Sequence, residues 1–294
     1  MPIAIHYENN IKNYKIWLNI ILLLFFFVGF YKNNLNYYFL NQITFKEMIY
    51  PLLFLITSLG INFIFNLLTK KNIWQNVDKS IILSLIMPPL FPFFIYFILV
   101  IIYNVINLNK KSNYLASIIV FKIITILITT FILHIGYENQ MEINNTYLYG
   151  IMDLFLGRSI GNFGTTCILL LIVSYLFFNL NFYYKKDIPI YIILTYSILA
   201  LILGLLNSDL VFIKTILNSH LWFAAIFLAP VNKYSPVSKK TRIFYGLLIG
   251  FVAFAFNVFL KMPNGTYISL FLIQTLWLLY CFLGRKKSIF ALIY

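Results

Sequence analysis

A glycine-rich turn at residues 157–164 has the residue types that most directly suggest ligand chemistry in this chain. Its sequence is GRSIGNFG, and it leads straight into an apolar segment that starts at Thr165. Glycine lets backbone amides approach a ligand closely, and a helix N-terminus favours an anion such as phosphate. The turn is therefore a candidate anion site, with a simple tight turn as the alternative.

A second candidate region covers residues 218–250, where an apolar segment stops at a loop bracketed by Pro230 and Pro236. The apolar run 221–229 is too short to cross roughly 30 Å of hydrocarbon, because a spanning helix needs about 20 residues. We interpret it as half of a broken helix, a feature that tends to mark a path for a ligand, ion or cofactor. His220 is a candidate polar ligand or proton relay there. The alternatives are a plain interhelical loop and a histidine that is only hydrogen-bonded packing.

Other reactive residues do not form a recognisable site. Cys167 and Cys281 both lie in apolar runs without paired spacing, which argues against a disulfide framework or a metal knuckle. His6, His134 and His220 are too scattered to indicate a metal centre. No serine, cysteine and histidine constellation supports a hydrolase, and no phosphate-binding loop with lysine is present.

The composition places these residues in a membrane. The chain is 62% hydrophobic and only 10% charged, with a mean hydropathy of +0.88, whereas about a quarter of the residues are charged in a typical soluble domain. Apolar runs recur without a long polar gap, so we expect one polytopic, all-α membrane domain over residues 1–294. The N-terminus has no signal-peptide cleavage pattern, which makes the first apolar run a retained span.

Ten apolar segments are predicted to be membrane spans. They cover about residues 16–31, 48–68, 79–90, 92–108, 116–136, 164–182, 188–206, 212–230, 242–260 and 266–284.

The basic residues predict the orientation of these spans. With the N-terminus inside, 16 of the 22 basic residues fall in inner loops and 4 in outer loops, as expected for a membrane protein with both termini in the cytoplasm. Lys122 and Lys214 then lie near segment ends, where their long side chains are expected to snorkel. The net charge of +14 is explained by this topology, because the lysines form short pairs between apolar runs instead of a nucleic-acid-binding face.

Prolines suggest an internal repeat. The third segment ends at Pro88 and Pro89, and the eighth segment, the third of the second half, ends at Pro230. We therefore expect two inverted five-span repeats, at about residues 16–136 and 164–284, with broken helices three and eight. The alternative is that these prolines simply terminate spans.

Several of these stretches resemble one family, the membrane subunits D of the Rnf electron-transport complex and B of the sodium-translocating NADH:quinone reductase. The similarity covers most of residues 80–280 in order. The matching stretches are residues 85–92, 153–161, 220–223, 230–231, 235–238, Lys240, Arg242, 245–250 and 263–265. The chain differs from the family pattern at Ala229 and Asn264, where the family has acidic residues.

The resemblance implies a flavin-dependent electron-transfer subunit coupled to ion translocation, which works in the cell membrane with other membrane subunits. The family attaches flavin mononucleotide (FMN) to a threonine on the outer side, and Thr146 is the best positional match. The resemblance also implies a flavin cradle formed by Gly157, Ser159, Gly161, Gly164, Thr165 and Thr166. The implied translocation path includes Pro88, Pro89, His220 and Pro230.

Two other functions are compatible with the same sequence. Inverted five-span repeats with broken helices also suit a solute permease or channel, and the loss of the family's aspartate at position 229 favours that function. A degenerate scaffold subunit that lacks flavin is the third alternative. The absorbance spectrum of the purified protein separates the flavin-dependent subunit from the permease or channel.

Overall fold

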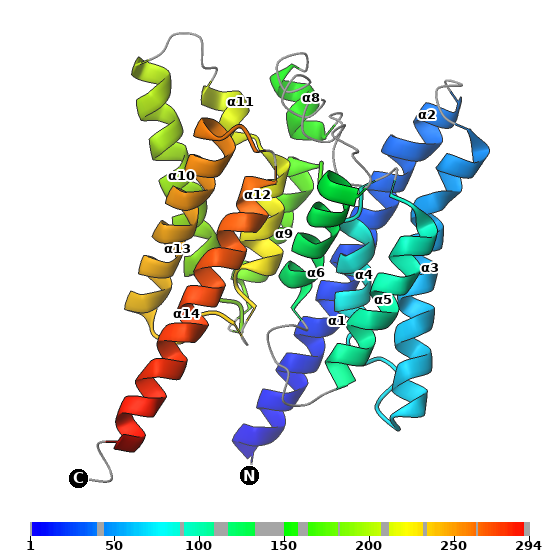
Figure 1. The fold of residues 1–294 in the computed structure, drawn as a ribbon, viewed down its shortest axis with the longest axis horizontal. Helices are drawn as coiled ribbons and strands as arrows, with labels where there is room; N and C mark the ends of the chain where they lie inside the picture. The colour runs from blue at the N-terminus through cyan, green and yellow to red at the C-terminus, as the bar shows by residue number, and fades with distance from the viewer. Residues whose placement is uncertain are drawn as a thin grey trace. The chain divides into compact units, whose positions relative to one another are not determined.

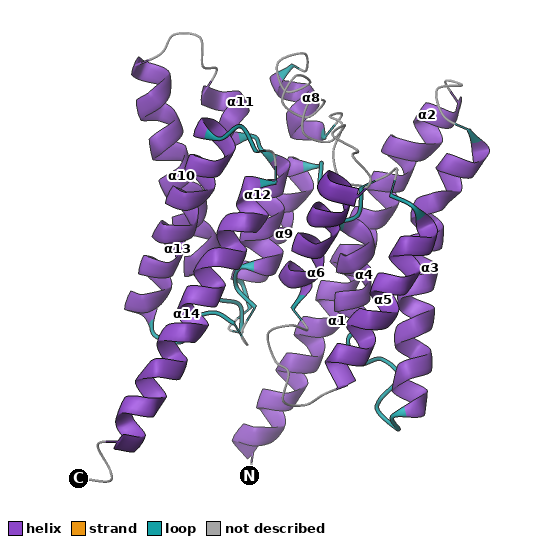
Figure 2. Cartoon of the chain, in the orientation of Figure 1, coloured by secondary structure: helices purple, strands orange, loops and turns teal. Residues whose placement is uncertain are grey.

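The computed structural model describes residues 2–39, 44–88, 91–108, 117–132, 150–157, 164–181, 183–206, 212–231, 234–262 and 264–290. Within these residues every regular element is a helix (Figure 2), which confirms the predicted all-α class. Five helices in this part of the chain are long and apolar enough to cross a membrane, and shorter apolar helices accompany them. The chain is therefore a membrane protein, as its composition predicts.

Two compact units make up the chain, Met1–Tyr184 and Lys185–Tyr294. The first unit contains the helices labelled α1 to α9 in Figure 1. Their bounds are α1 Pro2–Phe30, α2 Asn36–Phe39, α3 Phe45–Leu68, α4 Val77–Leu85, α5 Phe93–Leu108, α6 Ile118–Leu127, α8 Ile151–Leu156 and α9 Ile168–Asn179. π-helical stretches extend α1 over Tyr31–Leu35 and α6 over Ile128–Ile132.

The second unit contains α10 to α14 (Figure 1). Their bounds are α10 Asp187–Leu206, α11 Phe212–Ile216, α12 Ser219–Phe223, α13 Lys239–Phe254 and α14 Gly265–Phe290. π-helical stretches extend α12 over Ala224–Leu228 and α13 over Ala255–Phe259.

The boundary between the units follows the sixth apolar segment, whereas the predicted repeats divide before it. The physical reason is a set of ring contacts that attach α9 to α1. Trp17 and Phe177 have ring centroids 5.2 Å apart, and Tyr14 meets Phe178 edge-on at 5.7 Å. The inverted repeat itself stays a prediction.

Each of the ten predicted segments contains a helix, but segments three and eight are not helical throughout. Ten membrane spans stay a prediction. Segment three is helical only as far as Leu85. Segment eight consists of α11, a turn at Leu217 and Asn218, and α12 with its π-helical extension. Its break therefore lies before His220, in addition to the predicted end at Pro230.

Exposed apolar side chains line the outside of the long helices. On α10 they recur every three or four residues, which is one face of a helix. These residues are Ile190, Leu194, Ile198, Leu201 and Leu205. Water would penalise such a stripe and lipid would not, so this face of α10 suits contact with acyl chains.

Glycines allow α13 to pack directly against the backbone of α10. A Cβ added to Gly250 would lie 2.6 Å from the carbonyl oxygen of Ile192, and one added to Gly246 would lie 2.9 Å from the Cβ of Tyr191. The two glycines are four residues apart and so share one face of α13. Small residues at this spacing let membrane helices approach closely and gain dispersion contacts.

Gly250→Ala is expected to lower the stability of the protein by about 1–3 kcal/mol, because a methyl group in a filled interface forces the helices apart. Gly60→Ala in α3 is the matched control, since a Cβ there meets nothing within 4 Å. Thermal unfolding in detergent should show a lower melting temperature for Gly250→Ala alone. Equal melting temperatures for the two variants would contradict the close approach of α10 and α13.

Candidate functional site

Gly157 has a backbone conformation that side chains disfavour. It ends α8 with φ +79°, and its amide donates to the carbonyl oxygen of Leu154 at 3.1 Å. A Cβ at this position would lie 2.6 Å from the Cα of Cys167. Glycine is therefore required here for two reasons, which are the left-handed φ and the close approach of the chain that leads into α9. Ser159 and Gly161, also predicted to be in the cradle, lie outside the described residues.

Gly164 connects the start of the sixth segment to the broken third segment. Its amide donates to the carbonyl oxygen of Leu85 at 3.2 Å, and an added Cβ would overlap the side chain of Leu85. This amide thus satisfies a carbonyl at the end of α4. It is already bonded within the protein, so it is not a free donor to an anion in this conformation.

Thr165 and Thr166 are both buried directly before α9. The ammonium group of Lys32 donates to the hydroxyl oxygen of Thr166 at 3.1 Å, across 134 residues of sequence. Lys32 is half-buried and lies in the π-helical stretch after α1. Stretches of this kind are frequent at functional sites. This contact of Lys32 could not be predicted from the sequence, because nothing local indicates so distant a partner.

The start of α9 adds a second source of positive potential near Thr166. This helix of 12 residues begins after Cys167, whose side chain does not cap it. The first amides of a helix have no acceptor within the helix and carry partial positive charge. Together with the Lys32 ammonium they form a positive region that suits an anionic group. We call Lys32, Thr166 and the first turn of α9 the α9 entry site.

Lys122 meets the broken end of segment three. Its ammonium donates to the carbonyl oxygen of Ile86 at 2.8 Å, and its side chain is 0% exposed. The expectation that Lys122 snorkels to a surface is therefore wrong, because a backbone carbonyl inside the protein binds its charge. Pro88 follows, and its carbonyl oxygen accepts from the amide of Phe91 at 3.2 Å. Pro89 lies outside the described residues.

His220 lies in the first turn of α12, directly after the break of segment eight, and has a defined partner. Asn218 caps α12 by accepting from the amides of His220 and Leu221. The His220 ring is buried, and its Nδ1 lies 3.3 Å from the hydroxyl oxygen of Tyr267 on α14. This histidine is thus hydrogen-bonded to its surroundings, which is compatible both with structural packing and with a proton relay.

Pro230 ends the segment and begins a loop that two basic residues hold in place. The Lys185 ammonium donates to the carbonyl oxygen of Ser235 at 3.0 Å and to its hydroxyl oxygen at 2.7 Å. Arg242 pairs with Asp187 at 3.0 Å. Burial, together with the nearby charge of Arg242, lowers the pKa of Lys185 to about 8. The loop after segment eight is therefore fixed to the start of α10.

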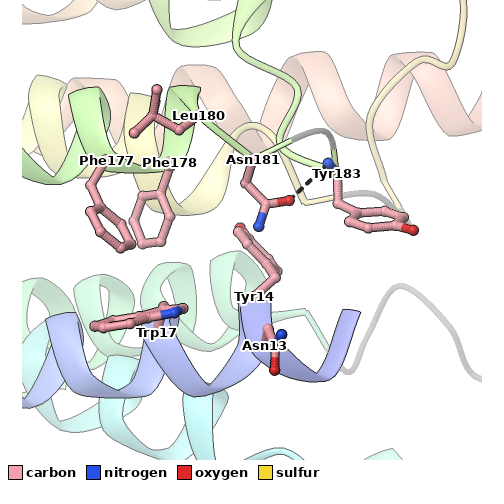
Figure 3. Close-up of a pocket in the computed structure, with 8 residues that line it drawn as sticks. All are labelled: Asn13, Tyr14, Trp17, Phe177, Phe178, Leu180, Asn181 and Tyr183. Carbon is pink, nitrogen blue, oxygen red and sulfur yellow. Dashed lines mark hydrogen bonds between the residues drawn. The ribbon is translucent and has the colours of Figure 1, made fainter. Parts of the chain in front are cut away.

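An aromatic pocket of about 370 Å³ lies between α1 and α9 (Figure 3). Its aromatic lining includes Tyr14 and Trp17 from α1 and Phe177 and Phe178 from α9. The other lining residues are Asn13, Leu180, Asn181 and Tyr183. The Oδ1 of Asn181 accepts from the amide of Tyr183 at 3.0 Å. This pocket was not predicted from the sequence. Aromatic residues at the start of the first segment and at the end of the sixth were the available signal, since such residues gather at membrane interfaces.

Two other predictions from the sequence concern the flavin tether and metal binding. Thr146, the proposed flavin tether, lies outside the described residues. In the part of the chain that the structure describes, no group of three or more histidine, cysteine or acidic residues is placed to hold a metal ion.

Lys185 predicts a pH dependence of stability. Its pKa of about 8 in the folded protein lies below its ordinary value of 10.5, so between these pH values the unfolded chain keeps a proton that the folded chain releases. The free energy of unfolding should therefore rise with pH in this window, by at most about 1.4 kcal/mol per unit. Below pH 8 both states are charged, and the contribution is constant.

Unfolding by sodium dodecyl sulfate in mixed micelles from pH 7 to 10 measures this effect. Lys185→Met should remove the rise, whereas Lys239→Met, at an exposed position in the same region, should keep it. A rise of the same size in the Lys185→Met variant would assign it to another group.

Comparison with known proteins places the chain in a family. A search of curated proteins finds no match. The family described as NQR2, RnfD, RnfE matches residues 3–279, which confirms the resemblance carried by residues 80–280. Its members are membrane subunits of electron-transport complexes. The match covers nearly the whole helical membrane chain, including both broken segments and the α9 entry site, and the chain therefore belongs to the NQR2, RnfD, RnfE family.

Proposed function

We propose that the chain is the membrane subunit of a flavin-dependent electron-transfer complex that couples redox chemistry to ion movement. Family membership supports a role in an electron-transport complex. The observation that favours a flavin in this chain is the α9 entry site, where a half-buried ammonium lies 3.1 Å from a threonine hydroxyl beside an uncapped helix N-terminus. Partner subunits of such a complex would supply and accept the electrons.

The α9 entry site fits the phosphate group of FMN. Lys32 would neutralise the phosphate, and the first amides of α9 would donate hydrogen bonds to it. Gly157 lets the preceding chain approach Cys167 without a side chain in the way. Thr146, in the connection ahead of α8, is the proposed covalent tether. Bound FMN would supply the electron transfer, while the protein would bind, orient and insulate it.

The two broken segments are the proposed path for the ion or cofactor. Each break leaves polar backbone groups without a partner in their own helix, inside an apolar bundle. Transporters place their binding sites at such breaks. Pro88 follows the end of α4, and Pro89 is the next residue in the sequence. His220 directly follows the second break, and Pro230 ends segment eight. An inverted relation between residues 16–136 and 164–284 is part of this proposal.

Contacts within the first unit support the proposed orientation of the spans. The end of α1 meets the start of α9 through Lys32 and Thr166, and the start of α1 meets the end of α9 through Trp17 and Phe177. The two helices are therefore antiparallel. Spans one and six must be antiparallel if each intervening segment crosses the membrane once. With the basic asymmetry, this favours both termini in the cytoplasm.

The flavin proposal is tested by mass. Produced with a flavin transferase, the chain should gain the mass of FMN, and Thr146→Ala should remove it because the acceptor hydroxyl is gone. Thr57→Ala is the matched control, since Thr57 bonds to the carbonyl oxygen of Leu53 within α3 and should leave the added mass in place. Mass spectrometry of the intact purified protein measures both.

Lys32→Gln separates tethering from binding. Because the glutamine cannot neutralise a phosphate, flavin that is bound without a covalent bond should wash out faster from this variant than from the wild type, as measured by absorbance. A colourless wild-type protein without the added mass would reject the flavin proposal. It would favour the permease or the scaffold.

The orientation is tested by labelling a single cysteine at position 145. In a Cys167→Ala, Cys281→Ala background, a membrane-impermeant maleimide should modify Asn145→Cys in intact cells. Lys186→Cys, in a proposed inner loop, should react only after permeabilisation. The reverse pattern would overturn the orientation.

A further inference from the structure

The end of α4 presents carbonyl oxygens inside the first unit. Leu85 and Ile86, where the helix ends, are both 0% exposed. The last carbonyls of a helix have no donor within the helix, and they carry the negative end of its dipole. In an apolar interior such groups cost several kcal/mol unless the protein supplies partners.

Two donors from distant parts of the chain meet these carbonyls. The amide of Gly164 bonds to the carbonyl oxygen of Leu85 at 3.2 Å, and the Lys122 ammonium bonds to that of Ile86 at 2.8 Å. Lys122 lies in the second turn of α6, which Ser117 caps by accepting from the amide of Val120. α6 packs against α4 (Figure 1), so the lysine is held by a regular helix beside the break.

The Ile86 contact has the chemistry of a cation site. Its length is in the range of charge-assisted hydrogen bonds, and carbonyl oxygens are the groups with which channels replace the hydration shell of a monovalent cation. A lysine that is 0% exposed is costly in a membrane protein and is retained where it serves a specific partner. Here that partner is the negative end of a broken helix.

We propose that the broken end of α4 is a binding site for a small monovalent cation, and that the ammonium group of Lys122 is its built-in occupant. The fixed charge neutralises the end of α4 and occupies the Ile86 carbonyl oxygen. An ion that passes this break on the proposed path would then be bound by groups other than the Ile86 carbonyl. This inference goes beyond the proposed function and does not depend on flavin.

Removal of the lysine side chain turns the proposal into a binding experiment. Lys122→Ala deletes three methylene groups and the ammonium, which together correspond to propylammonium. The variant should melt at least about 5 °C below the wild type, because a buried carbonyl and the end of a helix dipole lose their partner. Millimolar propylammonium should restore about half of this loss or more, with saturation, because it binds only the folded state.

Propanol and Lys122→Met are the matched controls. Propanol has the same length and donates a hydrogen bond but has no charge, so it should restore nothing. Lys122→Met fills the space without a charge, so propylammonium should not stabilise it. Equal rescue by propanol and propylammonium, or no rescue by either, would overturn the cation site.

A second measurement applies if Lys122→Ala does not fold after purification. Membranes are then solubilised with propylammonium or propanol, and the monodisperse fraction is measured by size-exclusion chromatography. A several-fold higher yield with propylammonium alone supports the site, and equal yields contradict it.

Discussion

The requirement that every buried backbone group has a partner determines how this chain can be broken inside a membrane. A continuous helix meets the requirement by itself, whereas α4 ends at Leu85 among buried residues. The amide of Gly164 and the ammonium of Lys122 provide the missing donors. The broken end thus depends on two other elements, the turn before α9 and the helix α6. A substitution that moves either element would remove a hydrogen-bond donor from the end of α4.

The same turn connects the break to the α9 entry site. Gly164 bonds to the end of α4, and two residues later Thr166 accepts from Lys32 at the start of α9. The glycine-rich turn therefore has two neighbours of opposite polarity. One is the negative end of a short helix, and the other is the positive end of a longer one. An anionic group at α9 and a fixed cation at α4 are the charges that these two ends favour.

The second unit uses different means to hold its broken segment. Gly246 and Gly250 bring α13 against the backbone of α10, which gives a close-packed helix pair. His220 bonds to Tyr267 on α14, and Lys185 bonds to the loop that follows Pro230. The helix after the break and the loop after the segment are thus attached to neighbouring elements. The first unit satisfies its break with a buried charge, whereas the second uses neutral hydrogen bonds within the bundle and a lysine at the loop.

The sequence by itself determined the fold class, the positions of the helices and the family. Apolar length and composition suffice for these, because lipid selects helices by local hydrophobicity and backbone self-sufficiency. Pro88 and Pro230 likewise marked the ends of segments three and eight, since proline ends a helix locally, whereas the break at Leu217 and Asn218 was not predicted. The boundary after the sixth segment, the burial of Lys122, the Lys32–Thr166 contact and the aromatic pocket were decided by tertiary structure alone. Each of these features joins residues that are far apart in the chain. The hydrophobicity of the surrounding sequence is the same whether a lysine snorkels to the surface or binds a distant carbonyl. Only the packed arrangement specifies which partner a buried polar group meets.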